Sequence, residues 1–306
     1  MFVIKYRKLF FTISGLLVLA SIISIFTFGI KLGTDFTGGT IMEVEYAVKA
    51  PGTNLVKEKL ATLNLGNIAL QNSGDRGFLI RLPAIDEAGR SKINQALSAL
   101  GDKTNQLTEK RFSSIGPALG QELYRKGLIA VIIVVLLIIL YIAFVFRKVS
   151  VVGGTKHATV SSWKYGIIAV LALIHDTLIP TGVISFLGYY YGVEIDALFI
   201  TALLTILGLS VNDTIVIFDR IREKLKERNN EPFEETVGRS LSETYSRSFN
   251  TSLTVILVLL ALVFYGPATT KIFALMLTIG MVVGTYSSIF IAAPLLVVWN
   301  NRQQKN

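Results

Sequence analysis

Long apolar blocks constrain this chain more than any other feature of its sequence. A helix that crosses roughly 30 Å of hydrocarbon needs about 20 mostly apolar residues. Six blocks meet that length, and they cover residues 9–30, 128–146, 167–191, 195–218, 249–265 and 272–298. Charged residues make up only 17% of the chain, below the ~25% of soluble domains. The sequence therefore predicts an α-helical membrane protein with six transmembrane helices.

The first block is expected to stay in the mature protein as an anchor. Lys5, Arg7 and Lys8 precede it, as they would in a signal peptide. Its apolar core is longer than the ~7–15 residues of a secretory signal, however, and the Phe-Gly-Ile-Lys sequence at 28–31 is a poor cleavage site. A retained first helix is therefore favoured.

Lysine and arginine fall mainly on one predicted face of the membrane. That face carries the amino-terminal cluster and a long series of further cations, whereas the short loops of the other face carry only Lys271. The series comprises Arg147, Lys148, Lys156, Lys164, Arg220, Arg222, Lys224, Lys226, Arg228, Arg239, Arg247, Arg302 and Lys305. Cytoplasmic loops carry such an excess. We therefore expect a multi-pass protein of the inner (cytoplasmic) membrane with both termini in the cytoplasm. The net charge of +9 fits a lipid bilayer better than a nucleic acid.

Residues 31–127 are predicted to form one extracytoplasmic domain, between residues 1–30 (first helix) and 128–306 (helices two to six). Alternating and helical apolar patterns predict a strand at 41–46, a helix at 54–63, strands at 68–72 and 78–82, a helix at 85–100 and a strand at 105–111. The order β-α-β-β-α-β is ferredoxin-like. The domain has no histidine and no paired-carboxylate or nucleophile–base pattern, so we expect no catalysis there.

Two glycine-containing segments flank this domain. Residues 33–40 read Gly-Thr-Asp-Phe-Thr-Gly-Gly-Thr, and a structural turn is favoured over a ligand site because the run lacks the Gly-Lys-Ser/Thr ending of a phosphate loop. The segment at 114–123 is expected to set where the second membrane helix begins. With no cysteine in the chain, disulfides and thiolate metal sites are excluded.

Two carboxylates lie inside predicted membrane helices, where a charge costs at least ~2.5–3.5 kcal/mol. Asp176 lies near mid-depth of the third helix and Asp213 lies in the inner part of the fourth. Arg247, which opens the fifth helix, is expected at a depth similar to that of Asp213. From spacing alone, a proton relay through an Asp213–Arg247 pair and a static ion pair between helices remain equally open. His175 points about 100° away from Asp176 on a helix and is expected to be a satisfied polar residue.

Small residues and charges suggest how the helices pack. Gly280, Gly284, Ser288 and Ala292 form a stripe suited to close helix contact. Asp219 and Arg222 continue the fourth helix into water. A helix that restarts after Pro232 is predicted to lie along the membrane surface, with Phe233, Val237 and Leu241 on its apolar face.

These motifs resemble those of the SecF family of protein-export membrane proteins, in the resistance-nodulation-division superfamily. Residues 33–40 resemble its GxDFxGG motif, through Gly33, Asp35, Phe36, Gly38 and Gly39. Residues 115–123, with Gly116 and Pro117, are similar to its VGPxxGxEL motif, and 208–223, with Asn212, Asp213, Asp219 and Arg222, resemble its fourth-helix motif. Residues 247–252 and 284–292 match its fifth and sixth helices. Leu209, Thr177, Ser248 and the Gly266–Pro267 pair depart from the family pattern without removing an ionisable group.

The resemblance implies a subunit that pairs with SecD, associates with the SecYEG channel and uses the proton-motive force to help export a translocating polypeptide. It implies no cofactor or metal and no enzymatic activity of its own. It places the proton-responsive carboxylate and its partner at Asp213 and Arg247, adds Asp176, and favours the relay over the static pair. The alternatives are a scaffold subunit without proton coupling, and half of a small-molecule or lipid exporter of the same superfamily. An intramembrane enzyme is least favoured, since the chain lacks a paired-aspartate, serine or metal constellation.

Overall fold

A computed structural model describes residues 2–102, 104–146, 162–227 and 231–303. The chain divides into two compact units. The sheet unit comprises residues 32–129 and 194–197, and the helical unit comprises residues 1–31, 130–193 and 198–306. Of the cations used to predict orientation, Arg147, Lys148, Lys156, Arg228 and Lys305 lie outside the described residues.

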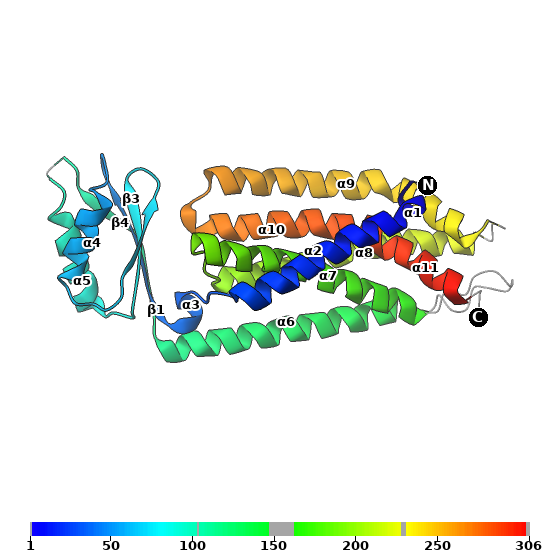
Figure 1. Cartoon of the computed structure of the whole chain (residues 1–306), viewed down its shortest axis with the longest axis horizontal. Coiled ribbons are helices and arrows are strands. Elements are labelled where there is room, and N and C mark those ends of the chain that lie inside the picture. The colour runs from blue at the N-terminus through cyan, green and yellow to red at the C-terminus, as the bar shows by residue number, and fades with distance from the viewer. Residues whose placement is uncertain (1, 103, 147–161, 228–230, 304–306) are drawn as a thin grey trace. The chain divides into compact units, whose positions relative to one another are not determined.

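The sheet unit has the predicted β-α-β-β-α-β order, which confirms the ferredoxin-like arrangement (Figure 1). Its elements are β1 (Gly39–Tyr46), α4 (Thr53–Ala61), β2 (Ala69–Ser73), β3 (Gly77–Leu82), α5 (Glu87–Ser98) and β4 (Leu107–Ile115), and a short helix, α3 (Thr34–Thr37), precedes β1. The strand order is β2-β3-β1-β4 and every neighbouring pair is antiparallel. The first strand, β1, therefore lies inside the sheet, between β3 and β4.

One face of this sheet packs against α4 and α5 to form the core of the unit. Met42, Val44 and Tyr46 of β1 are fully buried, as their alternation in the sequence requires. They pack with Val56 and Leu60 of α4 and with further residues of β3 and α5. The Tyr46 hydroxyl donates a hydrogen bond of 2.9 Å to the Leu97 carbonyl, so the one polar atom of that side chain is satisfied inside the core.

A charged pair joins α5 to β4, an edge strand of the sheet. Arg90 of α5 contacts Glu109 of β4 at 2.7 Å and lies over the ring of Phe112, 4.7 Å from its centroid. Asn94 donates a second hydrogen bond of 2.7 Å to Glu109. These donors, Arg90 first, stabilise the charged carboxylate and lower the pKa of Glu109 below its usual value.

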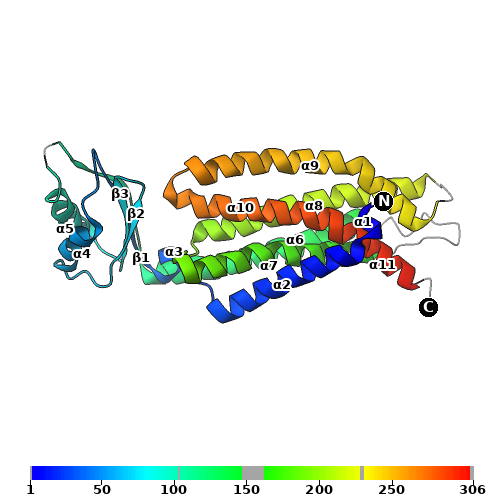
Figure 2. The same cartoon turned by 45° about the horizontal axis from the view of Figure 1, so that its top comes forward.

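The described residues contain six helices long and apolar enough to cross a membrane, which make up most of the helical unit. They are α2 (Arg7–Phe28), α6 (Pro117–Phe146), α7 (Ser162–Tyr191), α8 (Ala197–Lys226), α9 (Phe233–Tyr265) and a last helix made of α10 (Ala268–Ser287), the π-turn η2 (Ser288–Ala292) and α11 (Ala293–Gln303). A four-residue helix, α1 (Phe2–Lys5), precedes α2. The α10 helix contacts both α9 and α7, and α2 contacts α7 (Figures 1 and 2).

Two helices are longer than the hydropathy of the sequence predicts. The second span begins at Pro117 rather than near 128, because proline is favoured in the first turn of a helix and the polar residues after it do not interrupt one. The helix predicted to restart after Pro232 does begin there, but its predicted place along the membrane surface is wrong. It is continuous with the fifth span in α9, and Phe233, Val237 and Leu241 are buried in the apolar core of the helical unit.

Candidate functional site

Asp176 is the centre of a buried polar network between three helices. It lies halfway along α7, and its side chain has no exposed surface. One carboxylate oxygen accepts hydrogen bonds from Ser210 of α8 and from Ser287 of α10, the latter at 2.7 Å. The other lies 2.8 Å from Nδ1 of His175. Among the described residues, this carboxylate is held by hydroxyl and imidazole groups, without lysine or arginine.

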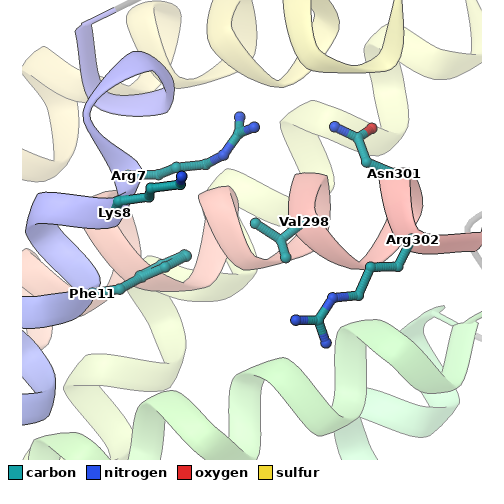
Figure 3. A pocket seen from close by; sticks show the side chains of 6 residues that line it. All are labelled: Arg7, Lys8, Phe11, Val298, Asn301 and Arg302. Atoms are coloured by element: carbon teal, nitrogen blue, oxygen red, sulfur yellow. The ribbon is translucent and has the colours of Figure 1, made fainter.

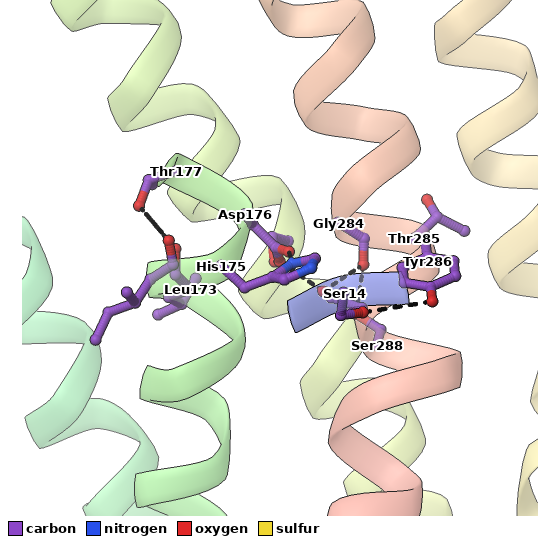
Figure 4. Close-up of polar contacts among 12 residues, drawn as sticks. Ser14, Leu173, His175, Asp176, Thr177, Gly284, Thr285, Tyr286 and Ser288 are labelled. Atoms are coloured by element: carbon purple, nitrogen blue, oxygen red, sulfur yellow. Dashed lines mark hydrogen bonds and ion pairs between the residues drawn. The ribbon is translucent and has the colours of Figure 1, made fainter. Parts of the chain in front are cut away.

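The sequence predicts that His175 points away from Asp176 as a satisfied polar residue. The structure differs, because His175 contacts Asp176. Its imidazole folds back onto the neighbouring carboxylate, because rotation about the side-chain bonds brings together two groups whose Cβ atoms diverge by 100°. The ring is stacked at 21° against Tyr286, with 6.4 Å between centroids (Figure 4). Its Nε2 atom is buried and has no hydrogen-bond partner in the described part of the chain. The imidazole thus has one nitrogen occupied by Asp176 and one without a partner among the described residues.

The network continues through the π-turn in the last helix. Ser288 lies 3.0 Å from Thr214 of α8 through their hydroxyl groups, while the preceding residue, Ser287, reaches Asp176. A π-turn inserts one extra residue into a helix and is frequent at functional sites. Here two consecutive serines contact two different helices: Ser287 bonds to Asp176 of α7, and Ser288 bonds to Thr214 of α8, the residue after Asp213.

The structure brings Asp213 and Arg247 into one neighbourhood without pairing them directly. Asp213 lies near the middle of α8 and is half-buried, and Arg247 lies on α9 and is exposed. Arg247 lies within range of a Coulombic interaction with the Asp213 carboxylate. No ion pair of 4.0 Å or less joins the two within the described ranges.

Ser248 adds a hydroxyl beside this carboxylate. It interacts with Asp213, but it is buried and forms no hydrogen bond of ordinary geometry with any described residue. Asp213 therefore has a hydroxyl and a guanidinium nearby, but neither forms a hydrogen bond of ordinary geometry with it, unlike the serines that bind Asp176. The two intramembrane carboxylates have different surroundings.

Close helix contact at Gly280 and Gly284 brings α10 against α8. A Cβ atom at Gly280 would lie 2.4 Å from the Ile206 side chain, and one at Gly284 would lie 3.1 Å from the Ser210 side chain. Because Ser210 and Ser287 both reach Asp176, the small residues set the separation at which the network can close.

Asp219, Arg222 and Asn212, which the sequence singles out on the fourth helix, lie outside this network. Asp219 and Arg222 form an ion pair of 3.5 Å with the carboxylate largely exposed, and an exposed pair of this kind contributes little to stability. Asn212 is exposed. The first two side chains shape the end of α8 rather than its buried face.

The segment at 33–40 organises the start of α8. Asp35 accepts a hydrogen bond of 3.0 Å from the backbone N–H of Ala197, the first residue of α8. The Gly33 N–H donates to the Ile195 carbonyl at 2.8 Å. The Asp35 carboxylate therefore serves as a cap, supplied from a distant part of the sequence, for a helix whose first N–H groups have no partner within it.

The remaining residues of this segment pack against the start of α6. The ring of Phe36 is buried and lies 5.6 Å from that of Tyr124. Gly38 has a φ of +80°, and a Cβ atom there would lie 2.6 Å from Cα of Pro117, so both its conformation and its surroundings require glycine. Gly39, also at positive φ, abuts Thr34, and Gly116 accepts the first hydrogen bond of α6, from Gly120. This geometry is that of a structural turn.

Sequence reasoning missed Ser210 and Ser287 as partners of Asp176. Serine is common in membrane helices and carries no charge, so neither residue stands out. Only their positions could have pointed to them as partners of Asp176: Ser210 lies in the motif at 208–214, and Ser287 lies between Gly284 and Ser288. Among the described residues, no group of three histidine, aspartate or glutamate side chains is arranged to hold a metal ion.

Comparisons with known proteins agree with these features. Residues 95–302 match the family described as "Protein export membrane protein SecD/SecF, C-terminal", and residues 23–50 match the "SecD/SecF GG Motif". The protein translocase subunit SecF of Thermobaculum terrenum is 42% identical over 98% of this chain and 94% of its own length. That of Anaerolinea thermophila is 38% identical, with the same coverage of both chains.

A solved structure gives the same result for the fold. The crystal structure of SecDF from Thermus thermophilus, described as a translocon-associated membrane protein, matches with a TM-score of 0.78 and 32% identity. The match covers 98% of this chain and 38% of the SecDF chain. Family match, identity over nearly the full length and fold agree, and the chain therefore belongs to the SecF family of protein-export membrane subunits.

Proposed function

We propose that this chain, with a SecD subunit, uses the proton-motive force across the cytoplasmic (inner) membrane to promote late steps of protein export through SecYEG. The SecDF chain in the solved structure is more than twice as long as this one, which supports a SecD-type partner for the helical unit. In the proposed orientation both termini are cytoplasmic and the sheet unit meets the emerging polypeptide outside. The proton gradient is the energy source, and no cofactor is required.

The observation that carries this proposal is the incomplete pairing of Asp213. A carboxylate inside a membrane helix is functional more often than structural, and a locked ion pair would hold it permanently charged. Asp213 has Arg247 nearby but not in direct contact. Protonation would cancel the attraction between α8 and α9, and deprotonation would restore it.

The available energy is sufficient for such a switch. One elementary charge that crosses 100 mV is worth about 2.3 kcal/mol, which corresponds to about a 50-fold bias between two conformations. The shift of α8 would reach the sheet unit through the cap, because Asp35 binds the first residue of that helix. Asp176 would act as a second proton-accepting group, with His175 beside it.

The test is export of a reporter preprotein into sealed vesicles that contain SecYEG, this chain and its SecD partner, with and without a proton gradient. We would compare wild type with Asp213→Asn, Asp176→Asn and Asp219→Asn. The last is a matched control, because Asp219 lies on the same helix but is exposed and, within the described ranges, pairs with Arg222 alone. Detergent pull-down with SecD would establish that every variant assembles.

We expect Asp213→Asn to lose the increment in export that the gradient produces, while Asp219→Asn keeps it. Export without a gradient should be the same in both variants. An Asp213→Asn variant that assembles and responds fully to the gradient would show that the residue is structural and that the chain serves as a scaffold.

A further inference from the structure

A cavity of about 300 Å³ lies between the beginning of α2 and the end of the last helix. Arg7, Lys8 and Phe11 of α2 line one side, and Val298, Asn301 and Arg302 of α11 line the other (Figure 3). Its volume is about ten times that of a water molecule in the liquid. The cavity thus combines three cationic side chains with an apolar floor made by Phe11 and Val298.

Two of the three cations have no counter-charge among the described residues. Arg7 contacts Glu234 of α9 at 2.8 Å, and Asn301 donates to the same carboxylate at 3.5 Å. Lys8 and Arg302 form no ion pair with any residue in the described stretches of the chain. Glu234 therefore joins α2 and α11 on the two sides of the cavity. Lys8 and Arg302 together leave a charge of about +2 available to bind an occupant.

The cavity also lies at a defined depth. Lys8 is in the first turn of α2 and Arg302 is the penultimate residue of α11, so both are at the ends of membrane-spanning helices. Phe11 follows Lys8 by three residues, or about 4.5 Å along the helix axis. Leu9 and Leu16 of α2 are exposed apolar side chains. Cations at the ends of two membrane-spanning helices thus accompany exposed apolar side chains of α2.

We propose that this cavity binds the headgroup of an anionic phospholipid. The lipid phosphate would lie between Lys8 and Arg302, and the glycerol and first acyl carbons would lie against Phe11 and Val298. Basic pockets between membrane helices bind anionic headgroups in this way. Simple snorkelling of Lys8 would account for its charge in the interface, but not for a second unpaired cation across an apolar cavity.

The experiment measures binding of fluorescent dioleoyl phosphatidylglycerol and dioleoyl phosphatidylcholine to the detergent-purified full chain at 100 mM salt. The double variant Lys8→Gln/Arg302→Gln removes both unpaired cations. The matched control, Lys5→Gln/Lys226→Gln, removes two exposed cations from the same predicted side of the membrane that do not line the cavity. Competition with inorganic phosphate separates a lipid site from a site for the free anion.

We expect wild type to prefer phosphatidylglycerol over phosphatidylcholine, and the double variant to bind phosphatidylglycerol about 25-fold more weakly, or about fivefold for each cation. The control should change binding less than twofold, and Phe11→Ala should weaken binding of both lipids. The proposal is overturned if the control weakens binding as much as the double variant, or if neither variant changes it. It is equally overturned if millimolar phosphate displaces the lipid, since the site would then bind a free anion.

Discussion

Replacement of Asp35 by alanine should loosen the start of α8 and leave the rest of the sheet unit unchanged. The Asp35 carboxylate accepts the N–H of Ala197 at 3.0 Å. Loss of a capping side chain costs about 1 kcal/mol, and loss of a negative charge at a helix N-terminus costs a further ~0.3–1 kcal/mol. The expected change in the local opening free energy is therefore ~1–2 kcal/mol.

Hydrogen exchange of the full-length protein in detergent measures this quantity directly. A change of ~1–2 kcal/mol corresponds to exchange that is about 5- to 30-fold faster in peptides that cover residues 197–204. The strand peptide over 77–82 should be unaffected. Asp35→Asn keeps an acceptor oxygen but loses the charge, so its effect should be smaller than that of Asp35→Ala.

Asp102→Ala provides a matched control for a lost carboxylate. Asp102 accepts the backbone N–H groups of Thr104 and Asn105, each at 2.8 Å, in a turn of the same unit. Its removal should accelerate exchange near residues 102–106 only. Unchanged exchange at 197–204 in Asp35→Ala, or equal acceleration throughout the protein, would refute the role of Asp35 as the cap of α8.

Three further outcomes follow from the packing and charge of each unit. Gly280→Val should lower the melting temperature in detergent, because its side chain would collide with Ile206 at a cost of about 1–3 kcal/mol; Gly208→Ala, where a Cβ meets nothing within 4 Å, should not. The lowered pKa of Glu109 means that its contribution to stability is full above the ordinary carboxylate pKa and is lost as the pH falls through the folded-state value. Resistance of the sheet unit to proteolysis should therefore decline on acidification, and it should decline less in Arg90→Gln, which lacks the partner. Tyr46→Phe should destabilise the sheet unit by about 0.5–1.5 kcal/mol in urea unfolding monitored by hydrogen exchange, because the hydrogen bond from Tyr46 is lost while the Leu97 carbonyl keeps the Leu100 N–H.

The sheet unit could be predicted almost completely from local patterns. Alternation in 41–46 and helical spacing in the two following helices fixed the order of elements, and that order selects one antiparallel arrangement. Hydropathy alone did not place the beginnings of α6 and α9, although the segment at 114–123 and Pro232 did indicate where the two helices start. Polar and charged residues follow within the first turns of both helices, and the burial of Phe233 depends on neighbouring helices that the local sequence does not reveal.

The polar network was predicted only in part, for a different reason. A charged residue in an apolar helix is conspicuous, and both Asp176 and Asp213 were found by that criterion. Their partners Ser210 and Ser287 are ordinary residues of membrane helices, and the contact of His175 with Asp176 depends on side-chain rotation rather than on helix geometry. The proton-coupling roles of Asp213, Arg247 and Asp176 remain predictions.

The two carboxylates differ in how their surroundings can respond to a proton. In the described part of the chain, every partner of Asp176 is a hydroxyl or an imidazole, and each of these groups can either donate or accept a hydrogen bond. The network can therefore rearrange its hydrogen bonds around a charged or a neutral Asp176 without moving a helix. Arginine cannot accept, so protonation of Asp213 removes its attraction to Arg247. In the proposed mechanism, Asp176 would hold a proton in place, and Asp213 would convert its arrival into a change in helix packing.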